Sequence, residues 1–122
     1  MKIIFILLIF IFPNIVSAKN LNFTKIVNLK SPWGSTFIDD NNILITEKSG
    51  AIKLINIKNK NIDIINHNIN FLEHGQGGLL DVLFNENFVY ISYSENRGNG
   101  KTSTSIAKSK FDKFQEASLD YL

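Results

Sequence analysis

The sequence predicts an all-β domain that follows a short N-terminal leader. From residue 21 to residue 111, short apolar runs alternate with turns rich in Asn, Asp, Gly and Ser, which is typical of closely spaced strands. No segment of this region repeats apolar residues with the period of an amphipathic helix. Several expected strands carry apolar side chains at both even and odd positions, so both faces of their sheets require burial. These observations favour stacked β-sheets.

The expected strands follow one another in chain order. Residues 23–29 alternate weakly and form the first expected strand, which Ser31-Pro32 ends. The later strands are expected at residues 33–38, 43–47, 51–57, 79–84, 88–93 and 102–111. Turns are expected at residues 39–42, where Asp and Asn side chains can bond their own backbone, and at residues 48–50, 85–88 and 95–101. Residues 58–70 are expected to be a long polar connection with one irregular strand.

The apolar pattern also predicts how the sheets are covered. In one expected strand, Ile52 and Leu54 lie on one face while Ile55 and Ile57 lie on the other. Residues 88–93 have the same two-sided pattern. Sheets covered on both faces are typical of a β-propeller, in which each blade lies between two neighbours.

The first 18 residues have the pattern of a secretory signal peptide. Lys2 supplies a positive charge, residues 3–12 form an apolar run, and Val16-Ser17-Ala18 places small residues at a cleavage site. The run is too short for an ordinary membrane span, although an uncleaved anchor is the alternative interpretation. We expect cleavage after Ala18, a mature domain of residues 19–122, a periplasmic or secreted location and no membrane contact after cleavage.

Composition excludes several classes of protein. The chain has no cysteine, which excludes a disulfide framework, a lipid-modified cysteine and a cysteine-based metal site. The net charge is +2 and the lysines are spread along the chain, so no nucleic-acid partner is predicted. With 122 residues, the chain is long enough for one small domain.

The most distinctive stretch is His-Gly-Gln-Gly-Gly-Leu-Leu-Asp at residues 74–81. Three glycines within four residues allow positive φ angles and close backbone approach, and Gln76 between them offers an amide to a ligand. A glycine-rich turn without any ligand is the competing interpretation. A phosphate-binding loop is excluded because the GxxxxGK[ST] spacing is absent and a strand is expected next.

Four stretches taken together resemble the opening of the glucose/sorbosone dehydrogenase family. They are residues 31–34 (SPWG), 43–50 (ILITEKSG), 74–82 (HGQGGLLDV) and 90–94 (YISYS). The third stretch is the specific one, and the order and spacing of the other three agree with it. The branch most resembled is the soluble aldose sugar dehydrogenases that use pyrroloquinoline quinone (PQQ). The resemblance covers about residues 21–111.

This resemblance implies a six-bladed β-propeller with PQQ and calcium at its mouth. It further implies that a histidine base removes the hydroxyl proton at C1 of an aldose, while hydride passes to a quinone polarised by calcium. Gln76 occupies the position whose glutamine binds the sugar substrate. Trp33, Gly34 and Glu47 match positions that we take as structural.

The chain also departs from the family pattern. The catalytic histidine of the family lies in an Asn-His-x-Gly-Gly motif, which is absent here, and neither His67 nor His74 has that context. His67 is expected to be exposed and functionally silent. We therefore predict no catalytic residue and no metal ligand in this chain, and no residue here is identifiable as a PQQ or calcium ligand.

Two functional hypotheses follow. The first is that the chain, with room for about two blades, is the N-terminal part of a PQQ-dependent dehydrogenase whose complete form oxidises aldoses. The second is a non-catalytic secreted β-propeller fragment that acts as a binding or interaction module, and a short secreted β protein without ligand is a third possibility. The particular sugar, the later electron acceptor and the oligomeric state are left open.

Overall fold

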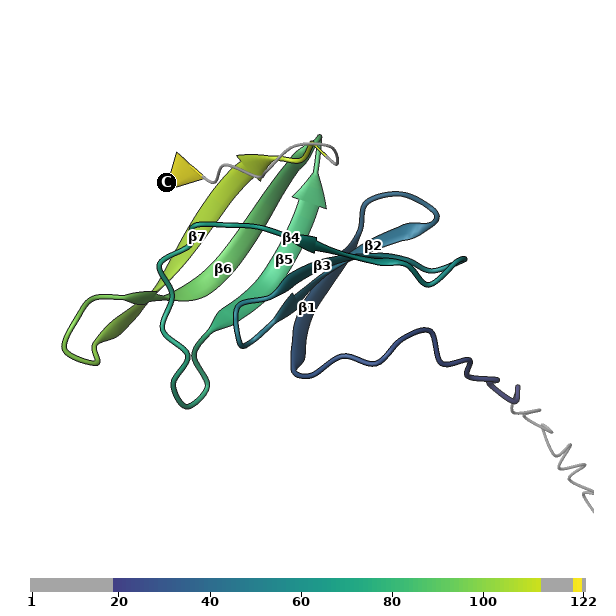
Figure 1. Ribbon diagram of the computed structural model, residues 1–122, viewed down its shortest axis with the longest axis horizontal. Coiled ribbons are helices and arrows are strands. Elements are labelled where there is room, and N and C mark those ends of the chain that lie inside the picture. The colour runs from purple at the N-terminus through teal and green to yellow at the C-terminus, as the bar shows by residue number, and fades with distance from the viewer. Residues whose placement is uncertain (1–18, 113–119, 122) are drawn as a thin grey trace, which may run out of the picture.

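The computed structural model describes residues 19–112 and 120–121, and the predicted signal peptide, residues 1–18, lies outside this part of the chain. The described residues form two four-stranded antiparallel sheets (Figure 1). The first sheet contains β1 (Pro32–Phe37), β2 (Asn42–Glu47), β3 (Ile52–Asn56) and β4 (Ile62–Ile65). The second contains β5 (Leu79–Asn85), β6 (Phe88–Asn96), β7 (Thr102–Lys110) and β8 (Asp120–Tyr121). The predicted all-β fold class is confirmed as two antiparallel sheets.

In each sheet the strands lie in chain order, because each strand pairs with the next one. Local turn chemistry explains these reversals. The Asp39 carboxylate accepts hydrogen bonds from the backbone N–H groups of Asn41 and Asn42, at 2.8 and 2.9 Å, and so closes the turn between β1 and β2. Glu86 and Asn87 both have positive φ, 49° and 67°, as a two-residue hairpin between β5 and β6 requires.

The two sheets approach most closely at their first strands. A Cβ on Gly34 of β1 would lie 2.7 Å from Asp81 Cα of β5, so only glycine permits this approach. The Thr46 hydroxyl accepts a hydrogen bond from the Gly34 N–H at 3.1 Å and donates one to the Leu80 carbonyl. One hydroxyl therefore links β1, β2 and β5 across the seam between the sheets.

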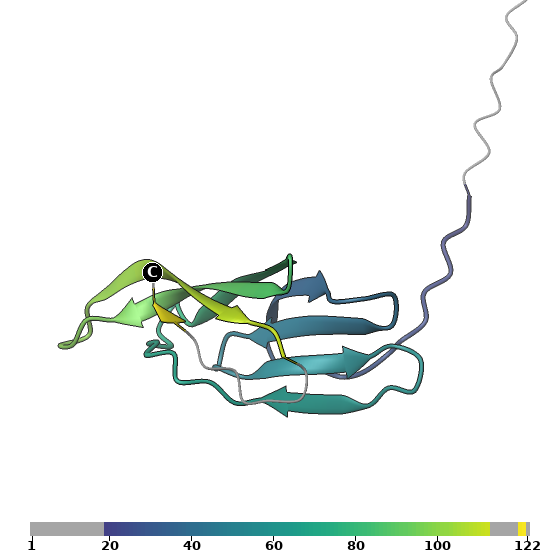
Figure 2. The same ribbon diagram turned by 90° about the horizontal axis from the view of Figure 1, so that it is seen from above.

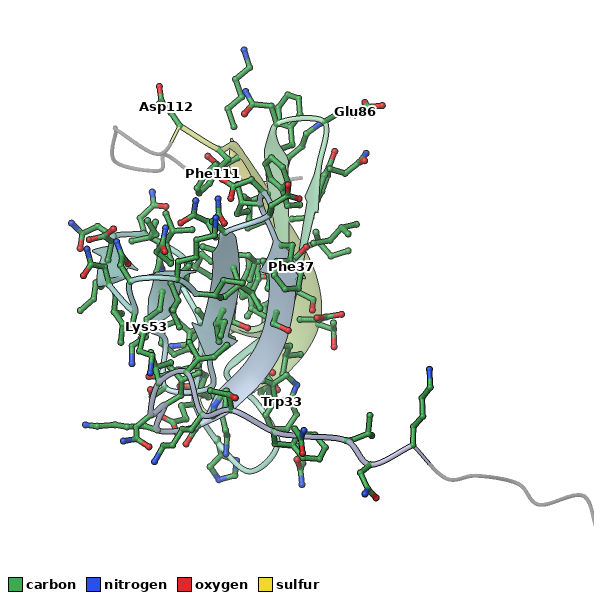
Figure 3. The ribbon with its side chains drawn as sticks, turned by 90° about the vertical axis from the view of Figure 1, so that its right-hand side faces the viewer. Trp33, Phe37, Lys53, Glu86, Phe111 and Asp112 are labelled. Atoms are coloured by element: carbon green, nitrogen blue, oxygen red, sulfur yellow. The ribbon has the colours of Figure 1, made fainter. Side chains whose placement is uncertain are left out.

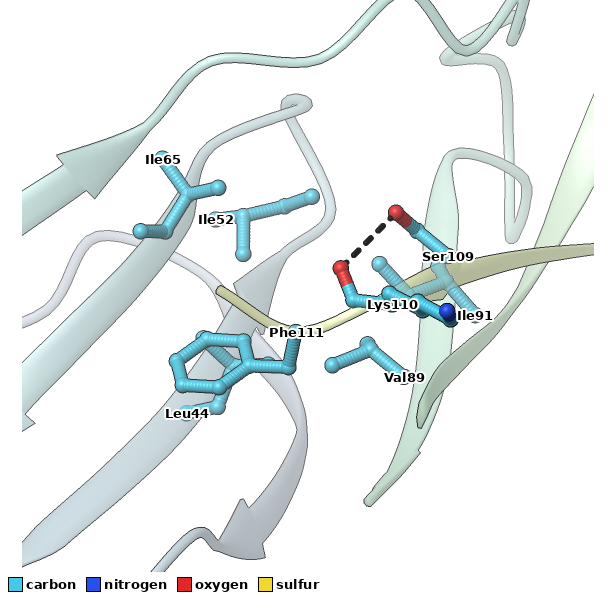
Figure 4. Close-up of a pocket in the computed structure, with 8 residues that line it drawn as sticks. All are labelled: Leu44, Ile52, Ile65, Val89, Ile91, Ser109, Lys110 and Phe111. Carbon is cyan, nitrogen blue, oxygen red and sulfur yellow. Dashed lines mark hydrogen bonds between the residues drawn. The ribbon is translucent and has the colours of Figure 1, made fainter. Parts of the chain in front are cut away.

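Figure 2 shows the two sheets next to each other, seen from above. Beyond the seam, apolar side chains of both sheets fill the space between them. The buried residues of this core are Leu44, Ile52, Leu54, Ile69, Leu79, Val82, Val89, Ile91, Tyr93 and Ala107. A small apolar cavity of about 20 Å³ remains between β2, β3 and β4 on one side and β6 and β7 on the other (Figure 4). That volume is near the minimum for a single water molecule, so the cavity is a packing gap and not a sugar site.

The other face of the first sheet, which we call the outer face, is partly open to solvent. One row across its four strands consists of Phe37, Ile43, Ile55 and Ile62, and the next contains Ser35, Ile45, Lys53 and Ile64. The central Ile45 and Ile55 are buried, whereas Phe37, Ile62 and Ile64 on the edge strands are exposed. Figure 3 views the molecule from this side, with Trp33 and Phe37 at opposite ends of β1.

Three expectations need correction. The predicted strand at residues 23–29 is wrong: the segment pairs with no strand, and Phe23 is 91% exposed, because weak alternation does not supply a partner for the backbone. The predicted end of β6 is too early, since β6 continues to Asn96. The strand β8, which pairs with β7 through Ala107 and Lys108, was not predicted at all. Among the described residues, no helix has the length and apolarity needed to span a membrane.

Candidate functional site

The glycine-rich stretch lies in the connection between the two sheets, just before β5. Both stems of its loop are held by Ser94 of β6: the Ser94 carbonyl accepts a hydrogen bond from the Leu72 N–H, and the Ser94 N–H donates one to the Gly78 carbonyl, each at 2.9 Å. Residues 73–77 therefore form a short closed loop at the end of the second sheet (Figure 1). The long-range pairing with β6, and not the loop's own sequence, determines where this loop lies.

The tip of the loop is a tight turn. The Gly77 N–H donates to the His74 carbonyl at 2.7 Å, and Gly75 adopts a φ of 55°, a conformation that favours glycine. Gln76 follows at the second central position and is exposed. Within the part of the chain that the structure describes, the Gln76 amide makes no hydrogen bond, so its donors and acceptor face solvent and are available to a ligand.

The loop also contacts the first sheet through Lys48, which follows β2. The Lys48 ammonium donates a hydrogen bond to the Gly75 carbonyl at 2.5 Å, and the Lys48 carbonyl accepts one from the Leu79 N–H at 3.3 Å. A Cβ on Gly78 would lie 2.2 Å from that Lys48 carbonyl oxygen, so glycine is required there for the two backbones to meet. The loop thus occupies the seam between the two sheets.

His67 supports the same region, and the expectation that it is exposed is wrong. It is half-buried; its Nδ1 accepts from the Ile69 N–H at 3.2 Å, and its Nε2 lies 2.6 Å from the Gly50 carbonyl. These partners assign the proton to Nε2, which donates to Gly50. His67 therefore fastens the connection after β4 to the turn after β2. His74 is exposed and contributes its backbone carbonyl to the loop turn.

Glu47 is the most buried charged group described at this end of the sheets, with 2% of its surface exposed. Its carboxylate accepts a hydrogen bond from the Lys30 N–H at 2.9 Å and pairs with the Lys53 ammonium at 2.8 Å. Burial raises the pKa of Glu47, but the Lys53 ammonium and the Lys30 N–H outweigh burial and hold the pKa below its ordinary value. Glu47 is thus a charged structural anchor, which agrees with the structural role that we expected.

A second polar residue between glycines lies at the same end of the second sheet. Asn99, between Gly98 and Gly100, is at the tip of the turn joining β6 and β7, and it is exposed like Gln76. Arg97 beside it forms an ion pair with Glu95 at 2.7 Å and donates to Ser103 at 3.0 Å. No described contact joins this turn to the first sheet, so Asn99 serves as a matched comparison for Gln76.

Among the described residues, no calcium site can be identified. No group of three or more His, Asp or Glu side chains among them could hold a metal ion. No step of chemistry through PQQ or calcium can be assigned to these residues.

This geometry defines an all-β protein that presents a polar loop at the seam between two sheets. The family model for glucose/sorbosone dehydrogenase matches residues 29–121. The chain belongs to that family. No curated protein sequence gives a significant match.

Solved structures of sugar dehydrogenases share this fold. A glucose dehydrogenase is 29% identical with a TM-score of 0.65, over 75% of this chain and 28% of its own. The apo-form of the soluble aldose sugar dehydrogenase from Escherichia coli is 26% identical with a TM-score of 0.64, over 75% and 28%. The PQQ-bound aldose sugar dehydrogenase from Streptomyces coelicolor is 17% identical with a TM-score of 0.66, over 77% and 30%, and shows the fold alone. The chain spans less than a third of each of these proteins.

Proposed function

We propose that this chain is the N-terminal part of a PQQ-dependent sugar dehydrogenase that oxidises aldoses at C1 with hydride transfer to the quinone. In this proposal the two sheets are the first two blades of a six-bladed β-propeller, and Gln76 binds the aldose. The family match supports the reaction class, and the short coverage of the solved proteins supports a larger complete protein. The observation that carries the role of Gln76 is its exposed amide at the tip of a loop held by both sheets.

The chemistry of the amide suits a sugar. A hydroxyl group of an aldose both donates and accepts hydrogen bonds, and the Gln76 amide offers two donors and one acceptor. Its neighbours Gly75 and Gly77 carry no side chains that would hinder a ligand. The chain thus supplies binding and orientation, while the proton acceptor, PQQ and calcium would be held by residues of the complete protein beyond those described.

The test is Gln76→Ala in the complete protein that contains this chain. Losing one hydrogen bond to a sugar hydroxyl costs about 0.5–1.5 kcal/mol, or more if the hydroxyl is left buried. We expect kcat/KM for aldoses to fall by around tenfold, since about 1.4 kcal/mol corresponds to a factor of ten. PQQ binding and thermal unfolding should not change.

Asn99→Ala is the control, because it removes an amide that is likewise exposed between two glycines, and sugar kinetics should not change. Unchanged kcat/KM in Gln76→Ala across several aldoses, in folded protein loaded with PQQ, would remove Gln76 from the site. Sugar binding without any oxidation would favour the alternative function, a non-catalytic secreted β-propeller fragment acting as a binding or interaction module.

We also propose export to the periplasm or the cell exterior. The support is the leader pattern of residues 1–18, with small residues before position 19. N-terminal sequencing of exported protein should begin at Lys19. Recovery of intact Met1 in a membrane fraction would instead show an uncleaved anchor.

A further inference from the structure

We infer that Lys48 is a positioning residue for the Gln76 loop: its ammonium holds the loop tip against the first sheet and so sets the place of the Gln76 amide. This inference rests on the proposed sugar-binding role of Gln76. It concerns a residue for which the sequence predicted no role.

The loop is fastened at its stems and, separately, at its tip. Ser94 holds its two stems, at Leu72 and Gly78, but neither contact reaches the tip. Inside the tip there is the hydrogen bond from the Gly77 N–H to the His74 carbonyl. Among the described residues, the Lys48 ammonium makes the one hydrogen bond between the tip and another element, through the Gly75 carbonyl at 2.5 Å. Gly75 directly precedes Gln76, so this bond fixes the peptide that leads into the binding residue.

Lys48 is itself rigidly placed. Its N–H donates to the Ser31 carbonyl at 2.9 Å, and its carbonyl accepts from the Leu79 N–H. The absence of a side chain at Gly78 allows the Lys48 backbone and stem to lie against the loop, since a Cβ there would also come within 2.9 Å of Lys48 Cγ. Lys48 therefore joins three segments: the entry to β1, the end of β2 and the entry to β5.

A charged donor at this point has a physical advantage. Hydrogen bonds from an ammonium to a carbonyl are stronger than those between neutral groups. A loop of small residues loses much conformational entropy when it is ordered, and a contact from outside the loop reduces the number of open conformations. We therefore expect the wild-type loop to be held ready for a ligand, and its order to depend on the Lys48 ammonium.

The experiment compares Lys48→Met, Lys48→Arg and a control, Lys58→Met, in the complete protein. Methionine keeps the apolar stem and removes the ammonium, arginine restores a cation, and Lys58 is an exposed lysine in the turn between β3 and β4. Hydrogen–deuterium exchange of the peptide covering residues 72–79 should become about two- to tenfold faster in Lys48→Met, which corresponds to the loss of one hydrogen bond. Exchange in β6 should not change, Lys48→Arg should restore slow exchange, and Lys58→Met should match wild type.

Sugar kinetics then test whether Lys48 acts through Gln76. Lys48→Met should lower kcat/KM for an aldose about two- to tenfold, and the same change in a Gln76→Ala background should cause no further loss. Additive losses, or loop exchange equal to wild type in Lys48→Met, would overturn the inference. If Gln76→Ala alone leaves kinetics unchanged, the proposed function of Gln76 fails, while the exchange data still decide whether Lys48 holds the loop.

Discussion

The two faces of the first sheet carry similar apolar side chains but differ in how far their edge strands are covered. On the face toward the second sheet, Ile52 of the central strand β3 is 2% exposed. On the outer face, Ile64 of the edge strand β4 is 68% exposed, although the central Ile55 of that face is buried. Ile52 and Ile64 are isoleucines in neighbouring strands of one sheet. The difference shows that an apolar pattern predicts which side chains favour burial. Whether a side chain is buried depends on another segment that packs against it.

Truncating one isoleucine on each face should give the largest difference in the free energy of unfolding. Ile52→Ala leaves a cavity in a closely packed core and should lower the free energy of unfolding by about 2–5 kcal/mol. Ile64→Ala removes an exposed side chain and should change it by less than about 0.5 kcal/mol. Urea denaturation followed by circular dichroism measures both. Equal losses would show that the outer face is covered in solution.

The outer face also contains the Glu47–Lys53 ion pair, so the stability that this face contributes depends partly on pH. Because the folded-state pKa of Glu47 lies below its ordinary value of 4.5, its contribution to stability is present above that pH and is lost as the pH falls through the folded pKa. Glu47→Gln should lower stability at pH 7 by about 1.5–3 kcal/mol, the value of a hydrogen bond to a charged group.

Urea midpoints measured from pH 7 to pH 3 give this dependence. The wild-type chain should lose more stability on acidification than Glu47→Gln, because the variant lacks the titrating carboxylate. Parallel pH profiles for the two proteins would show that the pair contributes little.

The close approach of the sheets can be tested at Gly34. In Gly34→Ala the new Cβ would meet backbone atoms of Asp81 and Val82 at 2.7 and 2.8 Å, so the sheets must move apart. Such overpacking typically costs about 1–3 kcal/mol. Ser35→Ala changes the adjacent, exposed residue and serves as the control. A Gly34→Ala protein as stable as that control would mean that the seam is more adaptable than its geometry indicates.

The smallest effect on folding is expected at the exposed edges of the outer face. Phe37→Ser combined with Ile64→Ser should change the free energy of unfolding by less than about 0.5 kcal/mol, since both side chains are exposed. The same pair should reduce self-association of residues 19–122, because exposed apolar patches promote it. Sedimentation velocity distinguishes the two proteins. A monomeric wild-type chain would contradict the idea that this face requires a partner.

The sequence predicted some features of the glycine-rich loop but not others. The three glycines and the following apolar run correctly predicted a turn and then a strand, because positive φ and apolar runs are local properties. The sequence also singled out Gln76, whose role in sugar binding stays a prediction. It did not single out Lys48 or Ser94, because both act through long-range hydrogen bonds. Lys48 bonds to Gly75, 27 positions away, and Ser94 bonds to Gly78, 16 positions away.

Most strands and turns of this protein follow from local sequence. Asp39 closes its turn with atoms two and three residues away, and the hairpin at Glu86 and Asn87 needs only its own backbone. Folding in three dimensions decided which apolar side chains of each sheet are buried, that residues 23–29 have no strand partner, and that His67 bonds to Gly50. The physical reason is range: turns and alternation depend on neighbours in the chain, whereas burial and loop position depend on segments that only folding brings together.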